Sequence, residues 1–324
     1  MEEITEKIEK SHFLINNIRK EVAKELVGQT NLVDSLLTGL LTGGHILIEG
    51  VPGLAKTSAV KAFAAAVKAD FKRIQFTPDL LPADIIGTEI YRPKSGDFVT
   101  RKGPLFNNII LADEINRAPS KVQAALLEAM EEQQVTIGDT TYSLAEPFLV
   151  LATQNPIEQE GTYELPEAQV DRFMLKVLVK YPERTQELEI LKTSAFEKKN
   201  PVMPVIDLEK LTAMKKLIDM IYVDDKLKEY IVDIVTATRE PEKFGMNISE
   251  YIEFGASPRA TIFLARVARV KAFLSGRAYI TPQDIKIIAP DVLRHRIILS
   301  FEAEAEDVMP DEIIKTVFDS VEVP

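Results

Sequence analysis

The segment from residue 46 to 58, ILIEGVPGLAKTS, has the residue types that bind phosphate groups. A β-branched run leads into a glycine-containing turn, and Lys56 and Thr57 follow at the start of an alanine-rich helical pattern. Backbone N–H groups of the turn and the helix N-terminus attract an anion, and Lys56 adds a mobile positive charge. The hydroxyl group of Thr57 suits Mg²⁺. The segment therefore predicts a site for a nucleoside triphosphate and its metal ion.

One position departs from the general pattern of such loops, G-x-x-x-x-G-K-[ST]. Ala55 stands at the second glycine position. A left-handed backbone there would cost an alanine roughly 1–2 kcal/mol, so we expect a right-handed conformation that leads into the helix. The residues expected to bind the nucleotide in this segment are Gly50, Pro52, Gly53, Leu54, Ala55, Lys56, Thr57 and Ser58.

Two adjacent acids end the apolar run NIILADE at residues 108–114. At the end of a buried strand, Asp113 can hold Mg²⁺ through water. Glu114 is then suited to orient and deprotonate an attacking water molecule. An acidic helix start after a strand has the same composition, but the phosphate-binding pattern upstream favours the catalytic interpretation.

A further apolar run, FLVLATQNP at residues 148–156, ends in polar side chains. The amide of Asn155 could position the same water beside the terminal phosphate without titrating. A turn before Pro156 also favours asparagine for purely local reasons. Because Asn155 follows directly after this strand, at the edge of the sheet where the ligand is expected, we favour the interpretation that it positions the water.

Two arginines are candidates for contacts with an anion. Arg172 precedes a fifth apolar run, and it could pair with Asp171 at the surface or reach the phosphate of a neighbouring subunit. Arg259 lies in the first turn of a predicted helix, where the helix dipole disfavours a cation. A cation in that position indicates an anionic partner.

Apolar runs alternate with helical patterns through the first half of the chain. This alternation predicts a parallel sheet with right-handed crossovers, and a ligand at the carboxyl ends of the strands. The first crossover helix is expected at 56–69. The expected strands are 45–49, 71–76, 108–112, 148–152 and 173–179.

Two segments, 86–103 and 133–144, interrupt this alternation with turn signals between alternating residues. Both predict hairpins. The hairpins are either additions to the sheet without a binding role or contacts for a partner or substrate, and we favour the second interpretation.

After about residue 182 the strand patterns stop and helical spacing takes over. Thr281, with Pro282 and Asp284 after it, is typical of a capped helix start. We expect a core with an N-terminal helix at 1–182, a linker with a helix at 183–206 and a helical domain at 207–324. The expected helices are 183–198, 208–221, 225–238, 258–275 and 281–296.

Composition makes several classes of protein less favoured. The chain has 324 residues, no cysteine and a net charge of −11, which disfavours a nonspecific grip on nucleic acid. No run approaches eighteen apolar residues and the N-terminus is polar, so we expect a cytosolic protein without membrane insertion. His12, His45 and His295 lack the spacing of metal ligands, and we interpret them as surface or core residues.

Five segments together resemble the MoxR family of AAA+ ATPases: GVPGLAKT, LADEINRAP, LATQNP, EGTYELPEAQVDRF and GASPRA. They occur in the family's order and span nearly the whole chain. EGTYELPEAQVDRF and FTPDLLPADIIGTEIY are far more specific than a phosphate-binding loop. The departure at Ala55 is similar to the form that this family itself uses.

The resemblance implies a role for each candidate residue. Val27, Gly28 and Gln29 correspond to the segment that lines the adenine pocket. Lys56 and Thr57 correspond to the Walker A motif.

The remaining candidates correspond to the catalytic positions of the family. Asp113 and Glu114 match Walker B, with Asp113 and Thr57 as ligands of Mg²⁺. Asn155 matches sensor 1, Arg172 the arginine finger and Arg259 sensor 2, which would contact the bound nucleotide.

The implied fold is α/β: an αβα core with a five-stranded parallel sheet and hairpin inserts, followed by a C-terminal all-helical lid domain. The implied assembly is a ring, usually a hexamer, with the hairpins facing a central pore. Similar proteins use ATP and Mg²⁺ as chaperone-like motors that mature or activate protein complexes, often with a von Willebrand A-domain partner. The sequence contains no such domain, so we expect that partner and the client to be separate chains.

Two other functions remain open. One is a nucleotide-gated scaffold with little turnover, which the Asp113–Glu114 pair disfavours. The other is a nucleic-acid motor, which Lys94, Arg101 and Lys102 of the first hairpin support and the acidic balance disfavours.

Overall fold

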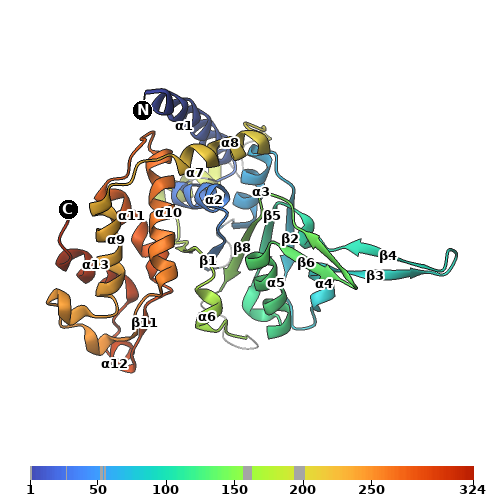
Figure 1. Cartoon of the computed structure of the whole chain (residues 1–324). Coiled ribbons are helices and arrows are strands. Elements are labelled where there is room, and N and C mark those ends of the chain that lie inside the picture. Colours follow the sequence, from blue (N-terminus) through green and yellow to red (C-terminus); the bar gives the residue numbers. More distant parts are fainter. Residues whose placement is uncertain (1, 27, 52–53, 55, 156–162, 193–200) are drawn as a thin grey trace. The chain divides into compact units, whose positions relative to one another are not determined.

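The computed structural model describes residues 2–26, 28–51, 54, 56–155, 163–192 and 201–324 (Figure 1). The chain forms two compact units. The first, here called the sheet unit, comprises residues 16–173 and 177–212; the second, the helical unit, comprises residues up to 15, 174–176 and 213–324. Each unit draws on separate stretches of the chain, so the domain limits at residues 182 and 206 stay predictions.

A five-stranded sheet forms the centre of the sheet unit. The neighbours β2–β5, β5–β8 and β8–β1 pair in parallel, which confirms the predicted architecture. β1, β5 and β8 are almost fully buried, which explains why they are apolar runs without alternation. In spatial order the strands are β2 (Phe71–Gln75), β5 (Ile109–Asp113), β8 (Leu149–Gln154), β1 (Ile46–Glu49) and β9 (Leu175–Leu178).

Helices cover both faces of the sheet. One face carries Leu47, Ile110 and Val150 in a core cluster that includes residues of α4 and α5. The alternate strand residues point to the other face, where α2 contacts β1 and α3 contacts β2 and β5. The helices with residues in this unit are α1 (Glu2–Ala23), α2 (Thr30–Thr42), α3 (Lys56–Ala66), α4 (Pro82–Ile86), α5 (Ser120–Glu132), α6 (Glu167–Val170), α7 (Arg184–Leu191) and α8 (Leu208–Asp219), of which α1 and α8 continue into the helical unit.

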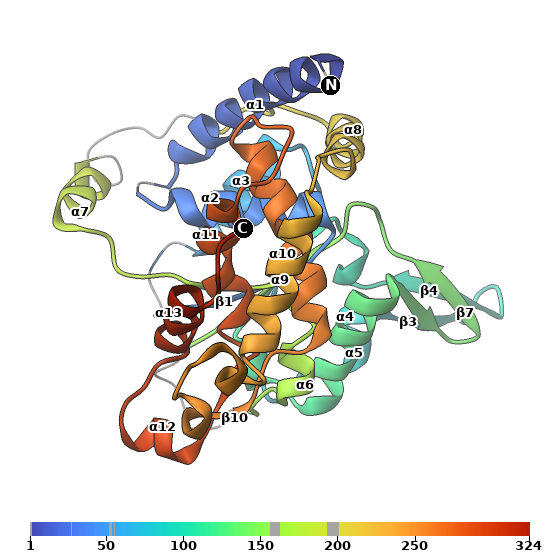
Figure 2. The same ribbon diagram turned by 60° about the vertical axis from the view of Figure 1, so that its left-hand side comes forward.

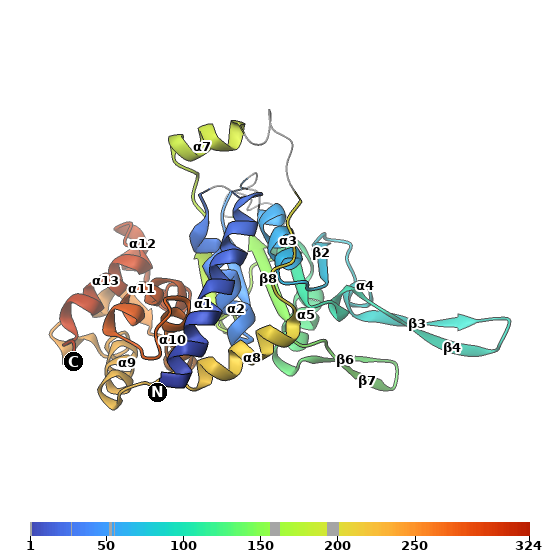
Figure 3. The same ribbon diagram turned by 90° about the horizontal axis from the view of Figure 1, so that it is seen from above.

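Both predicted hairpins are present. They are formed by β3 (Gly87–Arg92) with β4 (Asp97–Lys102), and by β6 (Gln134–Ile137) with β7 (Thr140–Ser143). They extend from the same side of the sheet unit (Figures 2 and 3).

A small cluster of contacts joins the two hairpins at their bases. The hydroxyl groups of Thr100 and Tyr142 are 3.0 Å apart. The Lys102 ammonium lies 4.7 Å from the Phe106 ring centroid and 5.3 Å from that of Tyr142. These contacts connect the first hairpin to Tyr142 of the second.

The four helices expected between residues 208 and 296 are present, each beginning and ending within three residues of its expected bounds, whereas α12 (Phe301–Ala305) and α13 (Pro310–Ser320) were not predicted. Asp284 N–H donates to the Thr281 hydroxyl, and Thr281 N–H donates to the Asp284 carboxylate, which confirms the predicted cap. The helices that lie wholly in this unit are α9 (Asp225–Ala237), α10 (Pro258–Leu274), α11 (Pro282–Leu293), α12 (Phe301–Ala305) and α13 (Pro310–Ser320).

The expectation that strands stop after residue 182 needs one correction. β10 (Ile252–Phe254) and β11 (Ile298–Leu299) form a short antiparallel pair in the helical unit. Strands of two and three residues are too short to show an alternating pattern, and their partners lie far apart in the sequence. Of the helix expected at 183–198, residues 193–198 lie outside the described residues.

Within the part of the chain that the structure describes, none of the helices combines the length and apolar composition needed to cross a bilayer.

His45 is a core histidine, as predicted, with both ring nitrogens bonded. Nδ1 accepts the Val150 N–H at 3.0 Å, and Nε2 lies 3.1 Å from the Met130 carbonyl oxygen, to which it donates. Burial lowers the pKa of His45 from 6.5 to about 4, and the hydrogen bond to Met130 opposes that shift. A proton on Nδ1 would also turn the acceptor for Val150 into a second donor.

We expect His45 to make the protein less stable at acid pH. The unfolded chain takes up a proton near pH 6.5 and the folded chain only near pH 4, so the free energy of unfolding falls as the pH drops through that window. Between pH 7 and pH 5 the loss from this residue is about 2 kcal/mol. Urea unfolding at both pH values should show a smaller pH-dependent loss in His45→Gln than in wild type. Equal losses in the two proteins would contradict the assignment.

Candidate active site

A cavity of about 400 Å³ lies at the carboxyl ends of β1, β5 and β8. These strands are neighbours in the sheet, and their register places Glu49 of β1 beside Gln154 of β8. Segments that are distant in sequence therefore meet at one edge. The described residues that line the cavity are Gly50, Leu54, Lys56, Thr57, Arg73, Asp113, Glu114, Thr153, Gln154 and Asn155.

The ammonium group of Lys56 points into the phosphate-binding segment. Lys56 begins α3, and its Nζ donates to the Gly50 carbonyl at 2.6 Å. Burial lowers the pKa of Lys56 below its usual range, while the carboxylates of Asp113, Glu114 and Glu49 oppose this effect. A half-buried cation among acids is suited to receive the negative charge of phosphate groups.

The position of Gly50 requires a glycine for reasons of packing. A Cβ atom there would lie 2.8 Å from the Val179 carbonyl oxygen, which is too close for any side chain. Of the other nucleotide-binding candidates, Thr57 and Ser58 lie in the first turn of α3, and Leu54 is buried. Val27, Pro52, Gly53 and Ala55 lie outside the described residues.

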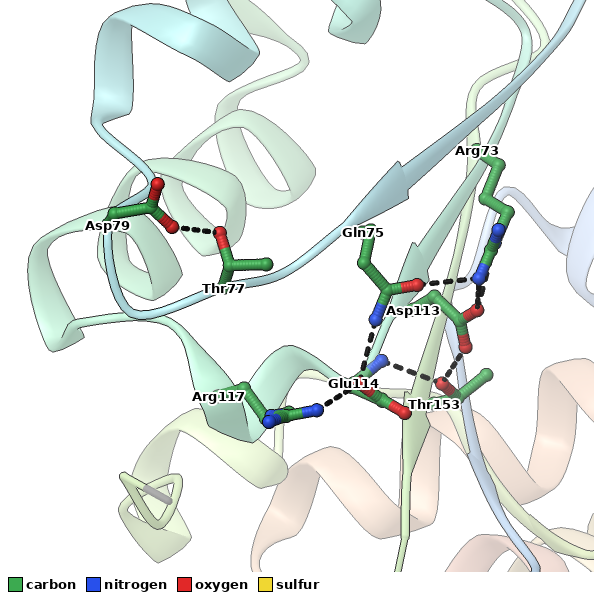
Figure 4. A network of polar contacts seen from close by, with 8 residues as sticks. All are labelled: Arg73, Gln75, Thr77, Asp79, Asp113, Glu114, Arg117 and Thr153. Atoms are coloured by element: carbon green, nitrogen blue, oxygen red, sulfur yellow. Dashed lines mark hydrogen bonds and ion pairs between the residues drawn. The ribbon is translucent and has the colours of Figure 1, made fainter. Parts of the chain in front are cut away.

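Asp113 ends β5 with both carboxylate oxygens engaged (Figure 4). The Thr153 hydroxyl donates to Oδ1 at 2.6 Å. Arg73, on the neighbouring strand β2, donates to Oδ2 from Nε at 2.9 Å and from Nη2 at 2.7 Å. The carboxylate faces the same cavity as Lys56 and Thr57, where it could hold a metal ion.

Glu114 has a left-handed backbone conformation, with φ 58° and ψ 53°. This conformation costs a residue with a side chain roughly 1–2 kcal/mol, and such strain is typical of functional sites. The Glu114 N–H donates to the Thr153 hydroxyl at 2.9 Å, so Thr153 connects the two acids. The Glu114 carboxylate accepts from Gln75 Nε2 at 2.7 Å and from Arg117 Nη1 at 3.1 Å (Figure 4).

Four residues of this network were missed from the sequence: Arg73, Gln75, Arg117 and Thr153. The pattern FKRIQF held a signal for two of them. Arg73 and Gln75 are polar residues two apart in a strand, so their side chains share one face of that strand. Thr153 is the polar exception near the end of an apolar strand.

The predicted adenine side contains a buried acceptor on Gln29. Gln29 Nε2 donates to the Leu54 carbonyl at 3.3 Å, which ties this segment to the phosphate-binding segment. Among the described residues, Gln29 Oε1 is buried and has no hydrogen-bond partner. A buried acceptor without a donor is costly, and an amino group such as that of adenine would satisfy it. Gly28, with φ 79°, precedes it in a conformation that favours glycine.

The remaining candidates lie in three places. Asn155 is 9% exposed and lines the cavity. Arg172 is not among the described residues of the lining, and it pairs with Glu131 of α5 at 3.1 Å. Arg259 lies in the first turn of α10 in the helical unit, as expected, and its contact with a nucleotide stays a prediction.

The fold and the cavity are those of a nucleotide-binding AAA protein, and the comparisons agree. Residues 45–175 match the profile described as the ATPase family associated with various cellular activities (AAA). Residues 245–317 match the AAA lid domain.

Proteins of similar sequence and structure identify the family within the AAA class. Chaperone MoxR1 of Mycobacterium tuberculosis is 48% identical, over 94% of this chain and 81% of its own. YeaC of Bacillus subtilis, an uncharacterised protein, is 44% identical over 97% and 96%. A crystal structure of a protein from Cytophaga hutchinsonii, assigned as an ATPase, has a TM-score of 0.93 and 50% identity over 100% of this chain and 98% of its own. The chain belongs to the MoxR family of AAA+ ATPases.

Proposed function

We propose that this protein hydrolyses ATP to ADP and phosphate with Mg²⁺, and that it uses this turnover to remodel, mature or activate partner protein complexes. The observation that carries the proposal is the single cavity in which Lys56, Thr57, Asp113, Glu114 and Asn155 meet. Family membership supports the same activity.

Each residue of the cavity has a separate role in phosphoryl transfer. Lys56 neutralises charge on the phosphates, and Thr57 and Asp113 would hold Mg²⁺, which supplies further positive charge at the phosphate oxygens. Glu114 orients a water molecule and accepts its proton, and Asn155 holds the same water in place. Arg172 completes the site of a neighbouring subunit.

The proposed assembly is a ring, most simply a hexamer, with ATP bound between subunits. The placement of Arg172 outside its own cavity supports a shared site. The hairpin β3–β4 supports contact with a client polypeptide, because it exposes Tyr91 and Phe98 as a cross-strand aromatic pair, 52% and 65% exposed. A separate von Willebrand A-domain partner and a cytosolic location stay predictions.

A chaperone-like role is supported by the relative in Mycobacterium tuberculosis, which is named a chaperone. The client can be sought with a variant that binds ATP but does not hydrolyse it. Proteins that co-purify with Glu114→Gln in the presence of ATP, and not in its absence, are candidate clients.

We expect Lys56→Met to weaken binding of Mg-ATP by roughly 10- to 100-fold, because a charge-assisted contact with the phosphates is lost. Calorimetry with Mg-ATP measures the loss directly, without turnover. Lys61→Met is the matched control, since Lys61 lies on the exposed side of the same helix. Equal affinities of Lys56→Met and Lys61→Met would refute the proposed nucleotide site.

A further inference from the structure

Arg73 occupies the predicted metal side of the cavity. Its guanidinium lines the cavity and makes two hydrogen bonds to one oxygen of Asp113, at 2.9 and 2.7 Å. The other oxygen of Asp113 accepts from Thr153. The carboxylate that would serve Mg²⁺ is therefore already neutralised by a cation of this chain.

The sheet register explains why Arg73 reaches this carboxylate. β2 is an edge strand of the sheet, and it pairs with β5 so that Arg73 lies opposite Leu111 and Gln75 opposite Asp113. Arg73 and Gln75 share one face of β2, so Arg73 is the diagonal neighbour of Asp113. Arg73 is 47% exposed at its side chain and Asp113 only 18%, so the guanidinium can leave while the carboxylate stays.

Arg73 also connects the two acids of the site. Its Nη2 donates to Gln75 Oε1, and Gln75 Nε2 donates to Glu114 Oε2 at 2.7 Å (Figure 4). The same guanidinium therefore holds Asp113 directly and helps to fix the amide that holds Glu114. A change at Asp113 would reach Glu114 through two side chains, those of Arg73 and Gln75.

We propose that Arg73 is a positioning residue that competes with the divalent cation for Asp113. The inference rests on the proposed function, in which Asp113 holds that cation. A guanidinium keeps its positive charge at every physiological pH. Because it repels a divalent ion near the same carboxylate, the two bonds from Arg73 to Oδ2 oppose binding of the metal with its nucleotide, whether Asp113 holds the metal directly or through water.

Removal of the competitor should strengthen metal binding. The test is binding of Mn²⁺ to protein saturated with ADP, followed by electron paramagnetic resonance, which needs no turnover. We expect Arg73→Gln to bind Mn²⁺ roughly three- to fivefold more tightly than wild type, the range that a partly exposed ion pair allows. A role of Arg73 in folding alone would not raise the affinity for a metal.

The matched control is Lys72→Gln. Lys72 is the neighbour of Arg73 on β2, so the variant removes the same charge one residue away. Its side chain is exposed and lines a different cavity, with Asp84 and Thr88. The Mn²⁺ affinity of Lys72→Gln should stay within about twofold of that of wild type. The gain expected for Arg73→Gln comes from loss of the contact with Asp113 and not from the change in net charge.

The outcomes separate the inference from the proposed function. Unchanged or weaker Mn²⁺ binding in Arg73→Gln, or an equal gain in Lys72→Gln, overturns the competition. If Arg73→Gln does not fold, Arg73→Lys decides in its place: it too should bind Mn²⁺ more tightly than wild type, because an ammonium cannot make the two-pronged contact. Failure of wild-type protein to bind ADP with Mn²⁺ at all would refute the proposed function instead.

Discussion

Glu114→Gln should bind Mg-ATP as wild type does and hydrolyse it roughly 10²- to 10⁴-fold more slowly, because an amide cannot accept a proton from water. The substitution preserves the shape of the side chain. Its amide oxygen can still accept from Gln75 Nε2, the 2.7 Å contact that the carboxylate makes now. The left-handed backbone at residue 114 is no more costly for glutamine than for glutamate. The loss is therefore expected in turnover and not in binding or folding.

Phosphate release measures turnover, and calorimetry measures binding. The matched control is Glu128→Gln, which removes a carboxylate from the exposed side of α5 and should leave both quantities unchanged. Unchanged hydrolysis by Glu114→Gln would refute its assigned role. Binding of Mg-ATP by wild-type protein without measurable hydrolysis would instead support the nucleotide-gated scaffold.

Arg172→Ala is expected to reduce hydrolysis by ~10³–10⁵-fold, the effect of an arginine finger, while the affinity of each subunit for ATP stays nearly the same. The physical reason is the position of Arg172. It is partly exposed at 34% and lies next to Glu131, and it does not appear in the described lining of its own cavity. A cation placed there acts on a phosphate only if another subunit supplies that phosphate.

The ion pair with Glu131 provides the matched control. Glu131→Gln removes the negative charge of the 3.1 Å ion pair but keeps the arginine, so hydrolysis should remain close to that of wild type. An equal loss in Glu131→Gln and Arg172→Ala would show that the pair stabilises the fold and that the arginine has no role in turnover.

Mixed assemblies decide whether the site is shared. An Arg172→Ala subunit retains Glu114, and a neighbouring Glu114→Gln subunit can supply the missing arginine. Mixtures of the two inactive variants should therefore regain part of the activity. No recovery at any ratio would count against a site between subunits.

The sequence predicted which residues meet at the site because each of them ends or directly follows a buried strand, or begins the helix after it. Parallel strands end at one edge, so the residues after three buried strands had to meet. Lys56, Asp113 and Asn155 do line one cavity. The buried strands were visible as apolar runs, and the cap at Thr281 as a short motif.

Other features depend on which strands pair and in which register, and no local pattern specifies either. The bonds from Arg73 to Asp113 and from Gln75 to Glu114 exist because β2 lies beside β5 with Gln75 opposite Asp113. β10 and β11 are visible only as a pair.

The sequence by itself determined that the polar residues at three strand ends meet in one cavity, the predicted triphosphate site. Only the tertiary structure decided how those residues are restrained: the left-handed Glu114, Thr153 between the two acids, and Arg73 on the metal side. The physical reason is that a hydrogen bond between neighbouring strands depends on an alignment set by the packing of the whole sheet.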